Sequence, residues 1–171
     1  MTTPAIQPDH ERRAELLHAL GLTAPDPKLD EFAVRLSLAA AVPYAMVNIF
    51  GTHQQFFGLA TPRGGELPTV GRSMPLDHGY CPEVARRRSA LVLPSVYVAP
   101  RFASNPVADQ IGIRSYAGAP LIHEDIVLGT VCFVGRESRP RSEGRAMLAL
   151  IKSHRNRVLD FIHRRAGYLP R

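Results

Sequence analysis

The chain has 171 residues, 45% of them hydrophobic, which is enough for one globular domain with a buried core. Its net charge of +6 comes mostly from arginines scattered along the chain, with one run at Arg86–Arg88. No helix-turn-helix or zinc signature accompanies these arginines, so nucleic acid is not an expected partner. No apolar run is long enough for a membrane span, and the N-terminus has no signal-peptide core. These features predict a cytoplasmic protein.

The first part of the chain predicts a tail and two helices. Residues 1–8 carry two prolines and no apolar periodicity, which is typical of a disordered tail, so the predicted single domain covers 9–167. Asp9 is placed to cap a first helix, and Asp26 to cap a second helix with Pro27 in its first turn. The second helix has apolar residues at spacings of three and four. These residues are Leu29, Phe32, Ala33, Leu36 and Ala40.

After the second helix the apolar period changes to two, which predicts strands at 45–50 and 54–59. The segment 61–71 is rich in Gly and Pro and lacks periodicity, so it is expected to be a loop of the kind that often lies over a binding site. A short helix is expected after Cys81, followed by a short buried strand at 90–93.

The last part of the chain predicts a hairpin and a long helix. The polar turn His123–Asp125 separates two apolar stretches, and a helix follows from about Ser142. The elements together predict an α+β fold with helices packed on one face of a sheet. The last helix carries an apolar stripe that would suit a homodimer through the terminal helices, or packing against the domain's own sheet. The stripe consists of Met147, Ile151, Val158, Phe161 and Ile162.

Three stretches in the second half carry a recognisable set of motifs. They are Arg101–Pro106 with the pattern RFxxNP, Ile113–Leu121 with IRxYAGxPL, and Leu128–Cys132 with GTxC. With these motifs the chain resembles the GAF domain family, and in particular a bacterial sensor subgroup. The resemblance covers roughly 29–161.

Two shorter stretches upstream are also similar to motifs of that subgroup. Gln55–Phe57 looks like its Q-W-F strand, and Tyr80–Cys81 looks like its F-C pair before a helix. The chain departs from the pattern at four positions. They are Ala99 and Gly135 in place of acidic residues, Ser115 in place of an aromatic residue, and Tyr80 in place of Phe.

The resemblance implies a central antiparallel sheet of five or six strands, with the first and last helices on one face and a pocket on the other. It also implies a sensory or regulatory role, because GAF domains most often bind small molecules or mediate dimerisation in signalling proteins. Fold alone does not choose between these roles. No kinase, cyclase or DNA-binding segment fits in the remaining length, so we expect any effector to be a separate signalling protein.

Five residues are candidates for a ligand site on the pocket face. They are Asp77, His78, Cys81, Arg114 and Tyr116. Arg114 could pair an anionic group, while Tyr116 and His78 could form hydrogen bonds to a ligand. The alternative is that Arg114 and Asp77 only tie loops to the sheet.

Cys81 is also a candidate for redox or nucleophilic chemistry. It lies at the expected start of a helix, where partial positive charge favours a thiolate, and His78 is close in sequence. Cys132 lies in an apolar strand and is expected to be an ordinary core residue. The two cysteines lack the spacing of a metal site, and no metal is expected.

The sequence does not identify a ligand or a cofactor. Cys81 is followed by Pro82 and not by the His common at bilin attachment sites, and no Asn-Lys pair of the cyclic-nucleotide signature is present. The cysteines also do not follow the pattern of the free methionine sulfoxide reductases. Three hypotheses remain: a stand-alone sensory domain that binds a small molecule, a cytoplasmic redox enzyme that uses Cys81 and resembles methionine sulfoxide reductase, and a purely structural dimerisation module.

Overall fold

The computed structural model describes residues 9–168, and the predicted tail at 1–8 lies outside them. The helices are α1 (His10–Ala19), α2 (Pro27–Ala40), α3 (Cys81–Arg87), α4 (Pro100–Ala103), α5 (Pro106–Gln110) and α6 (Gly144–Arg165). The strands are β1 (Tyr44–Phe50), β2 (Gln54–Ala60), β3 (Ser73–Met74), β4 (Leu91–Leu93), β5 (Ser115–His123) and β6 (Ile126–Gly135). Short 3-10 turns are present at Val96–Val98 and Arg141–Glu143.

The six strands form one antiparallel sheet in the order β3-β2-β1-β6-β5-β4, which confirms the predicted α+β class. The β5–β6 hairpin and β1 form its centre. The predicted turn is present, because Glu124 and Asp125 take left-handed backbone conformations between the two strands. In this hairpin Tyr116 is paired with Val134, and Gly118 with Cys132.

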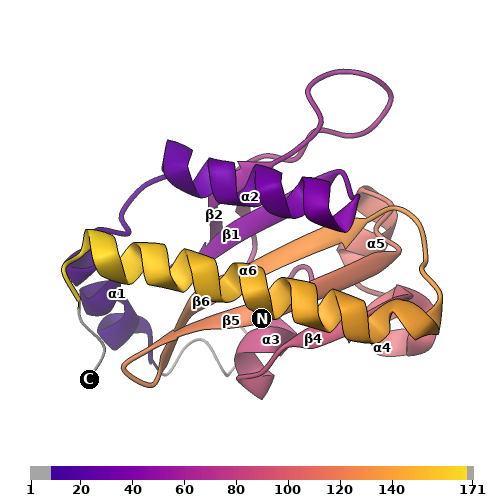
Figure 1. Ribbon diagram of the computed structural model, residues 1–171. Helices are drawn as coiled ribbons and strands as arrows, with labels where there is room; N and C mark the ends of the chain where they lie inside the picture. The colour runs from indigo at the N-terminus through magenta and orange to yellow at the C-terminus, as the bar shows by residue number, and fades with distance from the viewer. Residues whose placement is uncertain (1–8, 169–171) are drawn as a thin grey trace.

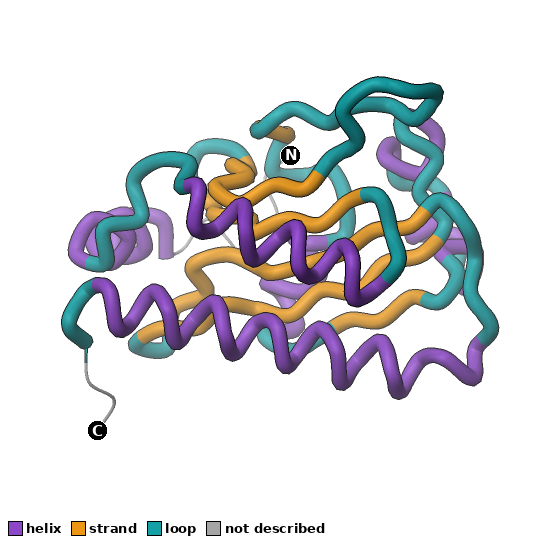
Figure 2. The backbone as a smooth tube through the Cα atoms, turned by 45° about the horizontal axis from the view of Figure 1, so that its top comes forward, coloured by secondary structure: helices purple, strands orange, loops and turns teal. Residues whose placement is uncertain are grey.

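Two long helices cover one face of the sheet. Figures 1 and 2 show α2 and α6 running side by side across the strands, with α1 at one end of this layer. The apolar residues of these helices share one cluster with the sheet residues that point toward them. Four of the five predicted stripe residues of α6 are buried there. They are Met147, Ile151, Val158 and Ile162. The stripe therefore packs against the domain's own sheet.

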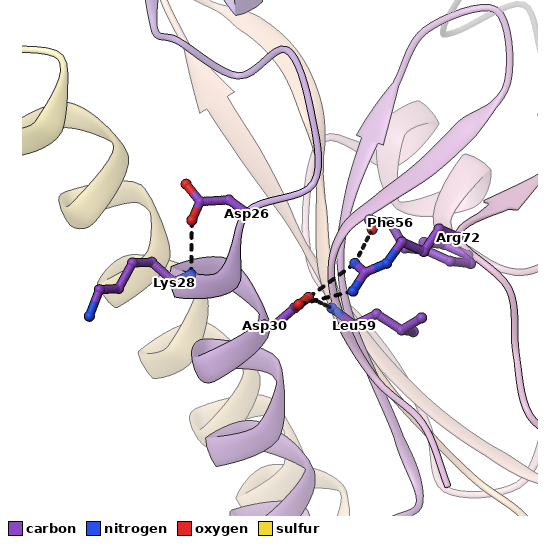
Figure 3. Close-up of polar contacts among 6 residues, drawn as sticks. All are labelled: Asp26, Lys28, Asp30, Phe56, Leu59 and Arg72. Atoms are coloured by element: carbon purple, nitrogen blue, oxygen red, sulfur yellow. Dashed lines mark hydrogen bonds and ion pairs between the residues drawn. The ribbon is translucent and has the colours of Figure 1, made fainter. Parts of the chain in front are cut away.

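Polar contacts fix α2 to the sheet edge. The Asp26 carboxylate accepts from the amide of Lys28 at 2.8 Å, which confirms the predicted cap. One turn later, Asp30 accepts from the amide of Leu59 at 2.8 Å and from both terminal nitrogens of Arg72 at 3.0 and 2.9 Å (Figure 3). Because Arg72 immediately precedes β3, this contact also anchors the end of the long loop that follows β2.

The opposite face of the sheet is covered by α3, α5 and the loops between them. A second apolar cluster lies there, separate from the cluster under the long helices. Alternating residues of each central strand supply the two clusters, so Val131 and Phe133 face the long helices while Cys132 and Val134 face α3. Of the helices described between residues 9 and 168, none has the length and apolar character needed to cross a bilayer.

Candidate functional site

Helix α3 places Cys81 over the middle of the sheet. The helix begins directly after Tyr80, with Pro82 in its first turn, where a missing amide hydrogen is tolerated. The Tyr80 hydroxyl donates to the carbonyl of Phe102 at 2.7 Å, and its ring packs edge-on against Tyr116 with centroids 5.3 Å apart. The residue before Cys81 is thus held from two sides, and the thiol points at the sheet.

Strands β5 and β6 bring polar side chains to this thiol. The Tyr116 hydroxyl lies 3.2 Å from the Cys81 sulfur, and the Thr130 hydroxyl donates to the same sulfur at 3.0 Å. Cys132 lies on the same face of β6 as Thr130, and its thiol donates to the Met46 sulfur at 3.8 Å. We call Cys81, Tyr116, Thr130 and Cys132 the thiol cluster; every member is buried.

The contacts within the thiol cluster make its two thiols unequal. The pKa of Cys81 is lowered chiefly by the neighbouring Cys132, with support from the hydroxyls of Thr130 and Tyr116, and these groups outweigh the opposing effect of burial. The pKa of Cys132 is raised well above its ordinary value, first by the neighbouring Cys81 and then by burial. The first proton to leave the pair is therefore that of Cys81.

A buried amide pair adjoins the thiol cluster. Asn48 donates to the Gln54 side-chain oxygen at 2.7 Å, and Gln54 donates to the carbonyls of Pro75 and His78 at 2.8 and 2.7 Å. Gln54 thereby holds the loop that leads to α3. The Asn48 side-chain oxygen has no hydrogen-bond partner among residues 9–168.

A small cavity of about 30 Å³ lies between these groups. Its lining includes both cysteines, Tyr116, Asn48 and Gln54, and is otherwise mostly apolar. A water molecule needs roughly 10–15 Å³ measured in this way, so the cavity holds one or two molecules of that size. A water placed here can donate to the free oxygen of Asn48.

A larger hollow of about 500 Å³ lies elsewhere, at the end of β6. It is lined by the exposed residues 136–138, by Leu67 and by Arg139. Arg139 already donates to the carbonyl of Ala40 and pairs with Glu143 at 3.8 Å. Half of the residues that line this hollow are exposed, whereas every member of the thiol cluster is buried, so the thiol cluster is the stronger candidate site.

The sequence-predicted site residues separate into two groups. Cys81 and Tyr116 contact each other and line the cavity. Arg114 instead donates to the carbonyls of Ala108 and Ile113 at 2.6 and 2.9 Å, which is the loop-tying arrangement weighed as its alternative. Asp77 and His78 do not line the cavity. Their side chains lie beside each other, with 3.9 Å between His78 Nε2 and Asp77 Oδ1.

Sequence reasoning missed Thr130, Asn48 and Gln54, and treated Cys132 only as a core residue. A usable signal was present for Thr130 and Cys132, because residues two apart in a strand share a face. Once β5 and β6 are paired, that face is the one carrying Tyr116. Asn48 is also a polar residue inside an otherwise apolar strand, which usually signals a hydrogen-bonded role.

Comparison with known proteins supports one family. Among solved structures, the GAF domain of the Acinetobacter phosphoenolpyruvate-protein phosphotransferase is similar at a TM-score of 0.61 and 16% identity, covering 96% of this chain and 98% of that one. The nlh2 GAF domain of A. aeolicus in an inactive state is similar at a TM-score of 0.61 and 16% identity. The match covers 91% of this chain and 95% of that one. Free methionine-R-sulfoxide reductase from Neisseria meningitidis, in complex with its substrate, is similar at a TM-score of 0.57 and 13% identity. The match covers 91% of this chain and 86% of that one.

At these identities the structural similarities establish the fold alone. A comparison with curated protein sequences found no match. The family model of the GAF domain, however, matches residues 25–153, which is most of the chain. The chain belongs to the GAF domain family.

Proposed function

We propose that this GAF domain is a sensory or regulatory module in the cytoplasm, and that its input site is the thiol cluster. The observation that carries the proposal is a titratable polar cluster enclosed in an otherwise apolar layer. Buried ionisable groups with displaced pKa values occur preferentially at functional sites. Two free, buried thiols suit a reducing compartment such as the cytoplasm.

The sheet offers a route from this site to the helical layer. Thr130 and Cys132 face α3, whereas Val131 between them belongs to the same apolar cluster as Ile151 and Val158 of α6. Because packed interiors deform little, a displacement of β6 on one face moves its residues on the other. A change at the thiol cluster can thus reach α6 and, through it, a second copy of the chain or a separate effector protein.

The volume of the cavity limits which molecules can bind at the input site. With about 30 Å³ available, the site accepts a molecule comparable to one or two waters, and an organic metabolite would need the wall formed by α3 and α5 to move. The enzyme hypothesis has less support for this reason. A free amino acid such as methionine sulfoxide does not fit in this volume, and the reductases resemble this chain only in fold.

The nearly filled cavity also favours a second candidate, the purely structural module. The two candidates differ in whether a change at the thiol cluster reaches α6. A homodimer through the terminal helices would have to use the outer surface of the helical layer, since the apolar stripe of α6 is already buried.

Native mass spectrometry of the purified chain tests the proposed input. We expect the mass of the polypeptide without a bound organic molecule, and the same spectrum gives the oligomeric state. A stoichiometric metabolite that leaves only on unfolding would contradict a site restricted to very small molecules.

A further inference from the structure

The two cysteines of the chain, distant in sequence, meet inside the fold. Cys81 comes from the start of α3 and Cys132 from the centre of β6, and both line the same small cavity. Both are free thiols and both are buried. This proximity is a precondition for a disulfide, because the bonded sulfurs must approach to about 2.05 Å without a large backbone movement.

We propose that Cys81 and Cys132 form a reversible disulfide when a small hydroperoxide, such as hydrogen peroxide, enters the adjoining cavity, and that this oxidation is the signal the domain senses. The inference rests on the proposed sensory function and names its input. The cavity is large enough for a molecule of that size and is lined by both cysteines.

The reaction proceeds in two balanced steps. In the first, the Cys81 thiolate attacks one peroxide oxygen and the O–O bond breaks. The sulfur is oxidised to a sulfenic acid, and the other oxygen leaves as hydroxide, which becomes water with a proton from solvent. In the second, the Cys132 sulfur attacks the Cys81 sulfur. The S–S bond forms, the S–O bond breaks, and the departing hydroxide takes the Cys132 proton as water. The net change is two thiols and one hydrogen peroxide to one disulfide and two waters.

The neighbours of the pair fit these roles. Cys81 is the thiol that loses its proton first, so it is the attacking nucleophile, and Cys132 stays protonated until the second step. The hydroxyls of Thr130 and Tyr116, at 3.0 and 3.2 Å from the Cys81 sulfur, are placed to hydrogen-bond the leaving oxygen. A dithiol reductant reverses the reaction by thiol–disulfide exchange.

The disulfide would also supply a mechanical output. It draws the first turn of α3 toward the middle of β6, because the sulfur–sulfur separation must shorten to the bond length. Since β6 contacts the helical layer through its alternate residues, the covalent link acts on the route to α6 described above.

The test uses the intact wild-type chain, treated with hydrogen peroxide, unfolded and alkylated under non-reducing conditions, then weighed by mass spectrometry. We expect both cysteines of a single chain to become resistant to alkylation, and the mass of the chain to fall by that of two hydrogen atoms. Treatment with dithiothreitol should restore both free thiols. Retention of both thiols, loss of only one, or disulfide-linked dimers would each overturn the proposal.

Two variants test which cysteine reacts in each step. Cys132→Ser should stop at a Cys81 sulfenic acid that reacts with dimedone. Cys81→Ser should slow the loss of the remaining thiol at least about tenfold, since each pKa unit changes the thiolate fraction about tenfold. Equal loss rates in the two variants would contradict the assigned order. If a serine variant does not fold, the alanine variant replaces it, and the wild-type result decides alone. A negative result here leaves the native mass-spectrometry test of the proposed function unaffected.

Discussion

Tyr116 reaches Cys81 by lying across Gly118. A Cβ atom at position 118 would overlap the Tyr116 hydroxyl and lie 2.6 Å from the ring carbon that carries it, so only glycine leaves room for the ring in this position. The tyrosine then extends to 3.2 Å from the Cys81 sulfur. Packing therefore explains why this chain has glycine two residues after the tyrosine in the Tyr-Ala-Gly stretch. The same packing brings Tyr116 into the thiol cluster.

Gly118→Ala should displace the Tyr116 ring and break its contact with Cys81. We expect a loss of about 1–3 kcal/mol in the free energy of unfolding, as for other overpacked core sites. Gly71→Ala is the matched control, because a Cβ there meets nothing within 4 Å. Urea unfolding of both variants checks the prediction, and equal stabilities would show that Tyr116 does not need the space.

The ultraviolet absorbance of the Cys81 thiolate should appear with a midpoint near pH 7, since the pKa of Cys81 is lowered to about 7. The thiolate fraction rises as the pH rises through that value, and Cys81→Ser should abolish the transition. Thr130→Val removes a hydroxyl that stabilises the charged form, so it should move the midpoint upward. An unchanged midpoint in this variant would contradict the assigned role of Thr130.

Gln54→Leu should destabilise the chain far more than His78→Ala. The leucine leaves the carbonyls of Pro75 and His78 and the amide of Asn48 without their partner, which costs about 1–3 kcal/mol. The His78 side chain is partly exposed, and its removal should change the free energy of unfolding by less than about 0.5 kcal/mol. Thermal unfolding compares the two. Similar losses would show that the Gln54 amide does not anchor the loop.

Asp30→Asn should loosen α2 and the loop before β3. The substitution weakens the two-point contact with Arg72, and we expect a loss of about 1 kcal/mol because both side chains are partly exposed to solvent. Glu31→Gln on the same helix is the control. Its partner Lys28 is 3.6 Å away in an exposed pair, so the loss should stay below about 0.5 kcal/mol. A larger loss in the control than in Asp30→Asn would contradict the anchoring role.

The order of the long helices and of the central strands β1, β2, β5 and β6 was predictable because local signals agreed with the global fold. Asp26 and Pro27 mark the start of α2, and the period-two pattern marks β1. The thiol cluster was only half predictable. Cys81 and Tyr116 belong to recognisable motifs, but their partners depend on strand register and on the docking of α3, which are long-range properties. For Arg114 the sequence suggested a ligand contact because of its charge, but in the fold its guanidinium donates to two backbone carbonyls.

The central claim, that the thiol cluster is coupled to the helical layer, is tested most directly by amide hydrogen exchange of the wild type and Thr130→Val. Thr69→Val is the control, because its hydroxyl bonds only a loop carbonyl at the surface. We predict faster exchange in α3 and in α6, with α1 unchanged, in Thr130→Val alone. Changes that stop at α3 and β6, or that spread equally over every helix, would contradict the coupling and favour the purely structural module.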